Sequence, residues 1–254
     1  MGSSQKDSWD DACCCLASKC FSGASFKTGA GSVTETIHKL LLDYSPAFGV
    51  VLSKTEIQKF LEYYELIQDW NRKINLTRLE SPADFARFHI LESCLIPPRI
   101  EADINSLVDL GSGAGLPGIP IAIMRPLLMV SLIESNLKKA IFLKEVCRTL
   151  RLENVEVIRN RFENLESGRW ECLTTRAIES FSQMLPHIER LSSGCRQVFL
   201  LCNPELASLI EVRFSDQWMF HQELVPESRN RILVSLTALQ VSRETAEPLV
   251  SRET

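Results

Sequence analysis

The feature that most constrains this chain is an alternation of short apolar runs with helical patterns, which begins near Asn105. The runs have the length of strands and lack the polar alternation of a strand with one face in water. Such strands, separated by helices, are typical of a parallel sheet that helices cover on both faces. We therefore expect an α/β domain with a doubly wound, mostly parallel sheet. Its strand-like runs are SLVDLG, LMVSLIE, VEVIRN, ECLTTRA and RQVFLLCN, followed by 218–224 and 232–239.

Helical patterns precede this domain. In SKTEIQKFLEYYELIQDWNRKI, apolar residues recur at helical spacing behind a capping Ser53 or Thr55. The segment SPADFARFHILESCLI opens with Ser-Pro, which is common where a helix begins, and a shorter helix is predicted over 34–42. The predicted organisation is a disordered polar leader over 1–32, a helical N-terminal lobe over 33–100, the α/β domain over 101–240 and a polar tail over 241–254.

The overall composition is that of a globular protein, with 45% hydrophobic and 24% charged residues. A formal net charge of −4 gives no general basic field, although it says little about local patches. No apolar run reaches the ~18 residues of a membrane helix. The N-terminus lacks the basic and then apolar segments of a signal peptide. We expect a cytoplasmic monomer with no membrane association.

The nine cysteines do not follow a disulfide or zinc pattern. Cys13, Cys14, Cys15 and Cys20 crowd the leader, while the others are scattered through apolar segments without a C-x-x-C pair. We expect reduced thiols and no metal, and leave open a metal or redox role for the N-terminal cluster. The pentapeptide VSRET occurs twice in the tail, which is too few copies for a repeat fold.

After the first strand-like run the chain passes through Gly111, Gly113 and Gly115. Glycine serves where the backbone needs a positive φ or approaches another group closely. The segment is therefore a tight structural turn or a surface against which a ligand lies. A glycine turn between a strand and a helix is typical of nucleotide-binding domains. A dinucleotide and S-adenosylmethionine both need an acidic residue at the ribose, and Glu134, at the end of the next strand, suits either.

Asp109 favours the sulfonium cofactor. It lies two residues before Gly111, where dinucleotide folds place an apolar side chain. A carboxylate there would meet the cationic methionine end of S-adenosylmethionine or orient the loop amides. It would repel a pyrophosphate by about 4 kcal/mol for charges ~4 Å apart at an effective dielectric of ~20. The chemistry favours a methyltransferase over a dehydrogenase, and a purely structural turn stays open.

Two later segments supply further candidates. Phe162 and Glu163 follow the third strand, in the loop that flanks the adenine in such folds, with a plain helix start as the alternative. Arg176 ends the fourth strand near the mouth of the crevice where open α/β sheets bind ligands. An ordinary surface arginine is the alternative for that position.

Several blocks of the sequence resemble a known family. WNRKINLT (70–77), HILES (89–93), LVDLGSGAGLPGIPIAI, RFENL and TRA occur in the order and spacing of the glucose-inhibited division B family, over about residues 53–205. The members are bacterial methyltransferases that modify ring nitrogen 7 of a guanine in 16S ribosomal RNA. The resemblance implies a Rossmann-like class I methyltransferase core with an N-terminal helical cap. It also implies S-adenosylmethionine contacts at Gly111, Leu116, Phe162, Glu163 and Arg176.

The chain departs from the family pattern at three places. Glu134 and Glu92 stand where the family usually has Asp, and one more methylene should still let Glu134 reach a ribose. Cys202-Asn203 replaces a frequent Lys-Gly. If that lysine touches RNA, the contact is missing here or supplied elsewhere. The change then concerns RNA affinity or substrate positioning rather than cofactor binding.

The implied reaction needs no general acid or base, because guanine nitrogen 7 carries a lone pair and no proton. Positioning supplies the catalysis, and His89 is a candidate for positioning the substrate or else an interdomain histidine. RNA requires positive charge, and our candidates for phosphate contacts are Arg87, Lys138 and Lys139, with a solvated helix face as the alternative. The expected partner is 16S ribosomal RNA in a partly assembled or unwound small-subunit particle. A small-molecule methyltransferase and a non-catalytic scaffold stay open.

Overall fold

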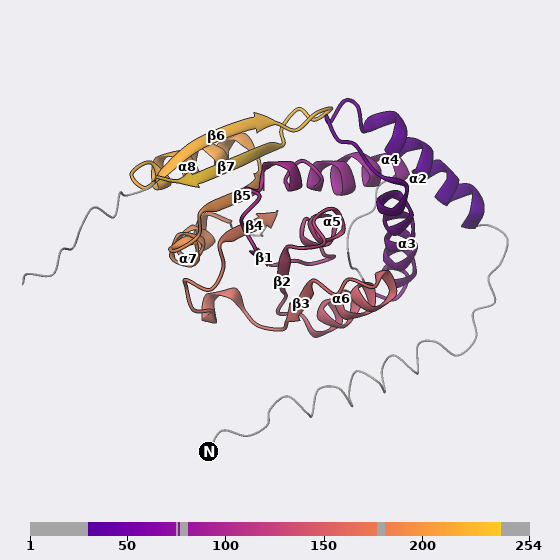
Figure 1. Ribbon diagram of the computed structural model, residues 1–254, viewed down its shortest axis with the longest axis horizontal. Coiled ribbons are helices and arrows are strands. Elements are labelled where there is room, and N and C mark those ends of the chain that lie inside the picture. Colours follow the sequence, from indigo (N-terminus) through magenta and orange to yellow (C-terminus); the bar gives the residue numbers. More distant parts are fainter. Residues whose placement is uncertain (1–29, 75, 77–80, 177–180, 240–254) are drawn as a thin grey trace, which may run out of the picture.

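The computed structural model describes residues 30–74, 76, 81–176 and 181–239. The polar tail, the N-terminal cysteine cluster and the leader up to residue 29 lie outside these residues. The described strands form one seven-stranded sheet in the order β3-β2-β1-β4-β5-β7-β6 (Figure 1). Its strands are β1 (Ser106–Leu110), β2 (Met129–Ile133), β3 (Val155–Ile158), β4 (Cys172–Arg176), β5 (Gln197–Cys202), β6 (Trp218–Leu224) and β7 (Ile232–Ala238).

The first five strands are parallel, and β7 lies antiparallel between β5 and β6. The predicted doubly wound, mostly parallel sheet is therefore confirmed. The order reverses between β1 and β4, because the chain builds outward from β1 to β3 and then returns to the other side of β1. Ligands of open α/β sheets bind at the carboxyl ends of the strands at such a reversal. The glycine turn follows β1 at that place.

Helices cover both faces of the sheet, as alternating side chains in β1 require. Leu107 points into one hydrophobic cluster and Val108 into the other. The first face packs against α5 (Gly118–Met124), α6 (Leu137–Leu150) and the N-terminal helices. The second packs against the short helix η3 (Phe162–Asn164), α7 (Phe181–Ser192) and α8 (Pro204–Phe214).

The predicted N-terminal helices are present, and two of them begin at their predicted caps, whereas the helix predicted over 34–42 begins earlier, at Ala30, within the predicted leader. They are α2 (Ala30–Tyr44), α3 (Lys54–Asn71) and α4 (Pro82–Phe85), followed by η2 (Pro97–Arg99). Ser53 forms a capping box with Glu56, and Ser81 caps α4. After α4 the helix widens into a π-helix, η1 (Ala86–Leu91), which the apolar spacing did not predict. Such wide turns occur often at functional sites.

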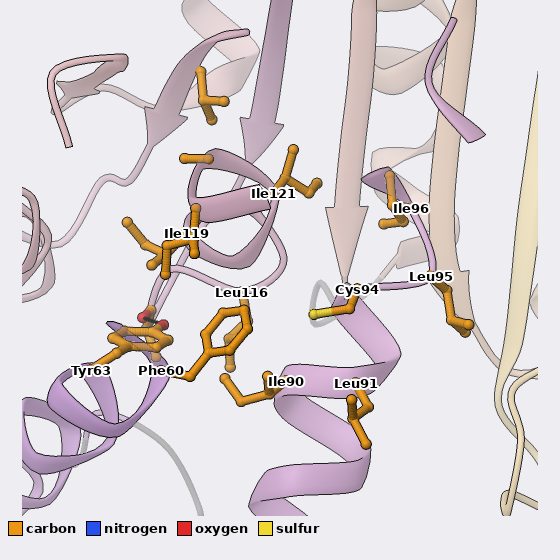
Figure 2. Packing of buried hydrophobic residues seen from close by; sticks show 14 of the residues in the cluster. Phe60, Tyr63, Ile90, Leu91, Cys94, Leu95, Ile96, Leu116, Ile119 and Ile121 are labelled. Atoms are coloured by element: carbon orange, nitrogen blue, oxygen red, sulfur yellow. Dashed lines mark hydrogen bonds between the residues drawn. The ribbon is translucent and has the colours of Figure 1, made fainter. Parts of the chain in front are cut away.

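The N-terminal helices share their hydrophobic core with the sheet. One cluster joins Ile37 of α2 and Phe60 of α3 to Leu132 of β2 and Phe199 of β5. Figure 2 shows Phe60 beside Leu116, which lies in the turn just before α5. The helical segment thus forms a cap whose apolar surface is covered by the α/β part of the chain, and the segment boundary near residue 100 stays a prediction.

The cysteines in the described part of the chain are free thiols. Cys94, Cys172 and Cys195 are buried, and burial raises the pKa of Cys195 and of Cys202 to about 12. Thiols with so high a pKa hold little thiolate at neutral pH and are poor nucleophiles. Within the same residues we find no group of three or more His, Cys, Asp or Glu side chains arranged to hold a metal, and no helix long and apolar enough to cross a membrane.

Candidate functional site

The glycine turn after β1 uses its amide groups within the protein. Gly111, Gly113 and Gly115 all have positive φ, at 69°, 57° and 93°, which explains why glycine stands at each. The loop amides then donate to protein oxygens: Ser112 to Ile133, Gly113 to Glu134, and Gly115 and Leu116 to Ser112. A diphosphate site needs such amides to face the ligand. This turn is therefore poorly suited to a dinucleotide.

Packing gives Gly115 a second reason to be glycine. A Cβ atom there would lie 2.6 Å from Ile119 and 3.1 Å from the Tyr63 hydroxyl. Gly115 and Leu116 are buried, whereas Gly111 is exposed and Gly113 half-buried. The solvent-accessible positions of the turn are thus Gly111 and Gly113, and a cofactor contact by any of its residues stays a prediction.

Glu134 reaches the turn from the end of β2, as its position in the sequence suggested. One carboxylate oxygen accepts the Gly113 amide at 2.9 Å and the other accepts the Asn136 amide at 2.7 Å. A carboxylate offers about four acceptor positions, so two remain for the hydroxyl groups of a ribose. The extra methylene of Glu134, compared with Asp, still lets the side chain span from β2 to the glycine turn.

Asp109 is fully buried beneath the turn. Its Oδ2 accepts the amide of Gly118, the first residue of α5, at 3.2 Å, while its Oδ1 lacks a hydrogen-bond partner among the described residues. Burial, with a smaller contribution from the nearby Glu134, raises the pKa of this carboxyl from 3.8 to about 7, although the hydrogen bond from Gly118 opposes the shift. Of the two predicted roles, this geometry supports the orientation of the loop more directly than open contact with a ligand.

Tyr63 of α3 also holds the turn, and sequence analysis did not identify it. Its side chain is fully buried and its hydroxyl donates to the carbonyl oxygen of Ala114. Figure 2 shows Tyr63 pointing from α3 toward Ile119 of α5. The apolar spacing of α3 marks residue 63 only as a core position, because nothing local reveals a partner 51 residues away.

Replacing Tyr63 with phenylalanine should destabilise the turn without disturbing the core. The Ala114 carbonyl loses its donor, which should lower the free energy of unfolding by about 1–2 kcal/mol and weaken cofactor binding several-fold. Urea unfolding and calorimetry with S-adenosylmethionine measure the two effects. Tyr64→Phe is the matched control, since Tyr64 packs against Phe85 on the neighbouring face of α3. Equal effects of both changes would contradict the positioning role of Tyr63.

Phe162 and Glu163 begin the short helix η3, which follows the end of β3 after three intervening residues, at the predicted place. The ring of Phe162 is buried, with its centroid 6.4 Å from that of His187 in an edge-on arrangement. Arg190 of α7 donates to the carbonyl oxygens of Glu163 and Leu165, which ties η3 to the next helix. Phe162 therefore serves the core as well as the site edge, and its contact with an adenine stays a prediction.

Arg176 and His89 meet at the end of β4. The Nη2 of Arg176 lies 2.9 Å from Nδ1 of His89, and its Nη1 is 3.4 Å from the Glu92 carboxylate. A guanidinium only donates hydrogen bonds, so Nδ1 of His89 is the acceptor and a neutral ring carries its proton on Nε2. The predicted alternative of a surface arginine is wrong, because the Arg176 side chain is only 10% exposed.

These features, a methyltransferase-like sheet order with two carboxylates at a glycine turn, agree with the comparisons to known proteins. The family model of rRNA small subunit methyltransferase G matches residues 56–228. The chain belongs to this family. A member from Nitrosomonas eutropha is 41% identical over 143 residues, which cover 54% of this chain and 66% of the relative. One from Stenotrophomonas maltophilia is 46% identical over 123 residues, covering 48% and 57%.

The chain thus spans between about half and two thirds of the length of these family members. Among solved structures, a SAM dependent methyltransferase from Aquifex aeolicus aligns with a TM-score of 0.53 at 14% sequence identity. The alignment covers 65% of this chain and 97% of that protein. At this identity the likeness concerns the fold, and it confirms the Rossmann-like methyltransferase architecture.

The three basic residues predicted to contact RNA have different surroundings in the structure. Lys138 is exposed at the start of α6, with the half-buried Lys139 beside it. Arg87 instead forms ion pairs with Asp84 at 3.1 Å and with Glu227 at 3.4 Å. Its charge is largely balanced within the protein, so Lys138 is the better placed of the three for a phosphate.

Asn203, at the position of the family's frequent Lys-Gly, has a structural role in this member. Its side-chain oxygen accepts the amide of Leu206 at 2.9 Å and caps α8. Asparagine is among the best residues for this purpose. Cys202 before it is half-buried at the end of β5. Asn203 therefore gives α8 a side-chain cap at the position of the glycine, and the uncharged Cys202 stands at the position of the lysine.

Proposed function

We propose that this protein transfers the methyl group of S-adenosylmethionine to nitrogen 7 of a guanine in 16S ribosomal RNA. It acts as a cytoplasmic monomer on the small ribosomal subunit. Membership of the methyltransferase G family supports the reaction class. The observation that carries the choice of cofactor is the turn itself, where Asp109 and Glu134 supply negative charge and the loop amides are already bonded within the protein. That arrangement suits a cationic nucleoside without phosphate.

Each site residue has a defined task in this proposal. The bound cofactor supplies a methyl group on a positively charged sulfur. The free acceptor positions of Glu134 take the ribose hydroxyls. Asp109 fixes the start of α5 through the Gly118 amide, and its ionised form, which predominates above pH 7, attracts the cationic amino acid end from beneath the turn. Arg176, the buried cation at the end of β4, forms an ion pair with the carboxylate of the cofactor.

The transfer step requires positioning rather than proton transfer. Nitrogen 7 of guanine attacks through its lone pair, so no side chain has to remove a proton. His89 fits a positioning role because its Nδ1 is held by Arg176, which fixes the plane of the ring. Restraint of this kind can supply a large part of the barrier reduction.

The packing of the cap favours RNA over a small-molecule substrate. A small-molecule methyltransferase needs a closed apolar pocket under the N-terminal helices. In the described residues that space is filled by one cluster, which includes Phe60, Leu91 and Leu116. A macromolecular substrate can instead approach the open carboxyl edge of the sheet.

Two measurements test the function. Calorimetry should show binding of S-adenosylmethionine and not of NAD; tight NAD binding alone would reverse the assignment. Purified protein should then methylate small-subunit particles from a strain lacking this gene, with mass mapping locating the product on a guanine. Naked 16S ribosomal RNA should react more slowly, since a paired guanine exposes its major-groove edge poorly in A-form helices.

Replacing Glu134 with glutamine should weaken S-adenosylmethionine binding about tenfold, or ~1.4 kcal/mol. An amide offers one oxygen where the carboxylate offers two, so either Gly113 or Asn136 loses its acceptor and the ribose meets a donor. Calorimetry measures the change. Glu153→Gln removes an exposed carboxylate elsewhere and serves as the control. An unchanged affinity in Glu134→Gln would argue against ribose binding by this residue.

A further inference from the structure

Glu92 is a buried carboxylate that two arginines share. Its side chain is 2% exposed, and its Oε2 lies 2.9 Å from Nη1 of Arg231 and 3.4 Å from Nη1 of Arg176. A buried carboxylate is costly unless opposite charges lie close to it. The geometry of each arginine is therefore tied to the position of Glu92.

The two arginines belong to different parts of the fold. Arg176 ends β4 beside the glycine turn, because Thr175 pairs with Leu110, the residue before Gly111. Arg231 lies before β7 and is 38% exposed, with its guanidinium 5.1 Å from the ring centroid of Phe88. Through Glu92, the helical segment that follows α4 thus contacts both the cofactor edge of the sheet and the turn between β6 and β7.

Arg176 is the partner with unused bonding capacity. Its Nη2 is bonded to His89, whereas its Nη1 makes no hydrogen bond to any of the described residues although it is buried. Leaving a buried donor unpaired is unfavourable, so this nitrogen is available for an acceptor that arrives with a ligand. The carboxylate is the one anionic group of S-adenosylmethionine and matches a guanidinium in charge and shape.

We propose that Glu92 is a positioning residue that holds Arg176 in the orientation the cofactor needs, and that its ion pair with Arg231 stabilises the buried carboxylate without acting on the cofactor site. The inference rests on the proposed function and adds to it the residue through which the N-terminal helices act on the cofactor site. Without the Glu92 charge, two neighbouring guanidinium groups repel each other and Arg176 loses its fixed orientation.

Calorimetry with S-adenosylmethionine on the full-length protein tests this role. Glu92→Gln should raise the Kd about tenfold, a coupling usual for contacting charged pairs. Arg231→Gln removes the other partner of the same carboxylate and should change the Kd by less than about twofold. Adding Glu92→Gln to Arg176→Gln should cause no further loss, because Glu92 acts through Arg176.

A second variant, Glu92→Asp, distinguishes loss of the carboxylate charge from a general disturbance of the fold. It keeps the carboxylate, shortens its reach by one methylene, and should give a Kd between those of the wild type and Glu92→Gln. Thermal unfolding checks that each variant is folded. If Glu92→Gln does not fold, the comparison is made between Glu92→Asp and Arg231→Gln. Equal Kd changes in the Glu92 and Arg231 variants would overturn the proposal, whereas a wild type that binds no S-adenosylmethionine would refute the proposed function instead.

Discussion

Asp109→Asn is expected to stabilise the free protein at pH 8 and to weaken its binding of S-adenosylmethionine. Burial raises the pKa of Asp109 from 3.8 to about 7, so the folded state holds a proton that the unfolded state releases. The resulting cost to stability grows as pH rises from about 4 to 7 and is complete above 7. A pKa raised from 3.8 to about 7 corresponds to a loss of at most about 4 kcal/mol in the free energy of unfolding. The variant avoids this cost, but its buried amide nitrogen has no hydrogen-bond partner. The net gain in its free energy of unfolding should therefore be about 2 kcal/mol.

The pH dependence distinguishes this explanation from a general packing effect. At pH 5 the cost in the wild type has reached only about 1.6 kcal/mol, which the unpaired amide nitrogen of the variant roughly cancels, so Asp109→Asn and the wild type should unfold at nearly the same temperature. At pH 8 the variant should unfold about 5 °C higher. Its affinity for S-adenosylmethionine should fall at least tenfold, because a neutral amide no longer attracts the cationic end. If Asp109→Asn were less stable than the wild type by the same amount at both pH values, ionisation of the buried Asp109 would not be destabilising the wild type.

Gly115→Ala should cause the largest loss of stability among single changes in the turn. The new Cβ would lie 2.6 Å from Ile119 and 3.0 Å from Leu143, and the φ of 93° disfavours any L side chain. Overpacking costs ~1–3 kcal/mol and the strained backbone ~1–3 kcal/mol more. We expect a loss of about 4 kcal/mol in the free energy of unfolding, measured with urea, and loss of cofactor binding as the turn is displaced.

Gly168→Ala is the matched control, because it measures the cost of the strained backbone without the overpacking. Gly168 has a φ of 79°, yet a Cβ there meets nothing within 4 Å. The free energy of unfolding of this variant should therefore fall by only ~1–2 kcal/mol, which is the cost of holding an alanine in the left-handed backbone conformation. If Gly115→Ala proved no more damaging than Gly168→Ala, the packing of Tyr63, Ile119 and Leu143 around the turn would have room that the structure does not show.

Much of the candidate site follows from local sequence. Asp109 and Glu134 come at the ends of successive strand-like runs, and parallel strands bring their carboxyl ends to one edge, so their proximity was predictable. The turn between them could be placed because glycines with positive φ leave a clear composition signal. The family resemblance added Leu116 and the ribosomal RNA substrate, whereas the contacts of Arg176 with His89 and Glu92 came only from the structure.

The sequence by itself determined the α/β architecture, the glycine turn and the two acidic residues beside it, because these depend on patterns within a few residues of each other. Only the tertiary structure decided that Tyr63 holds the turn, that Gly115 is required by packing, and that Glu92 joins Arg176 to Arg231. Those contacts link segments far apart in the chain, and which buried polar groups meet is decided by how the helical cap packs on the sheet.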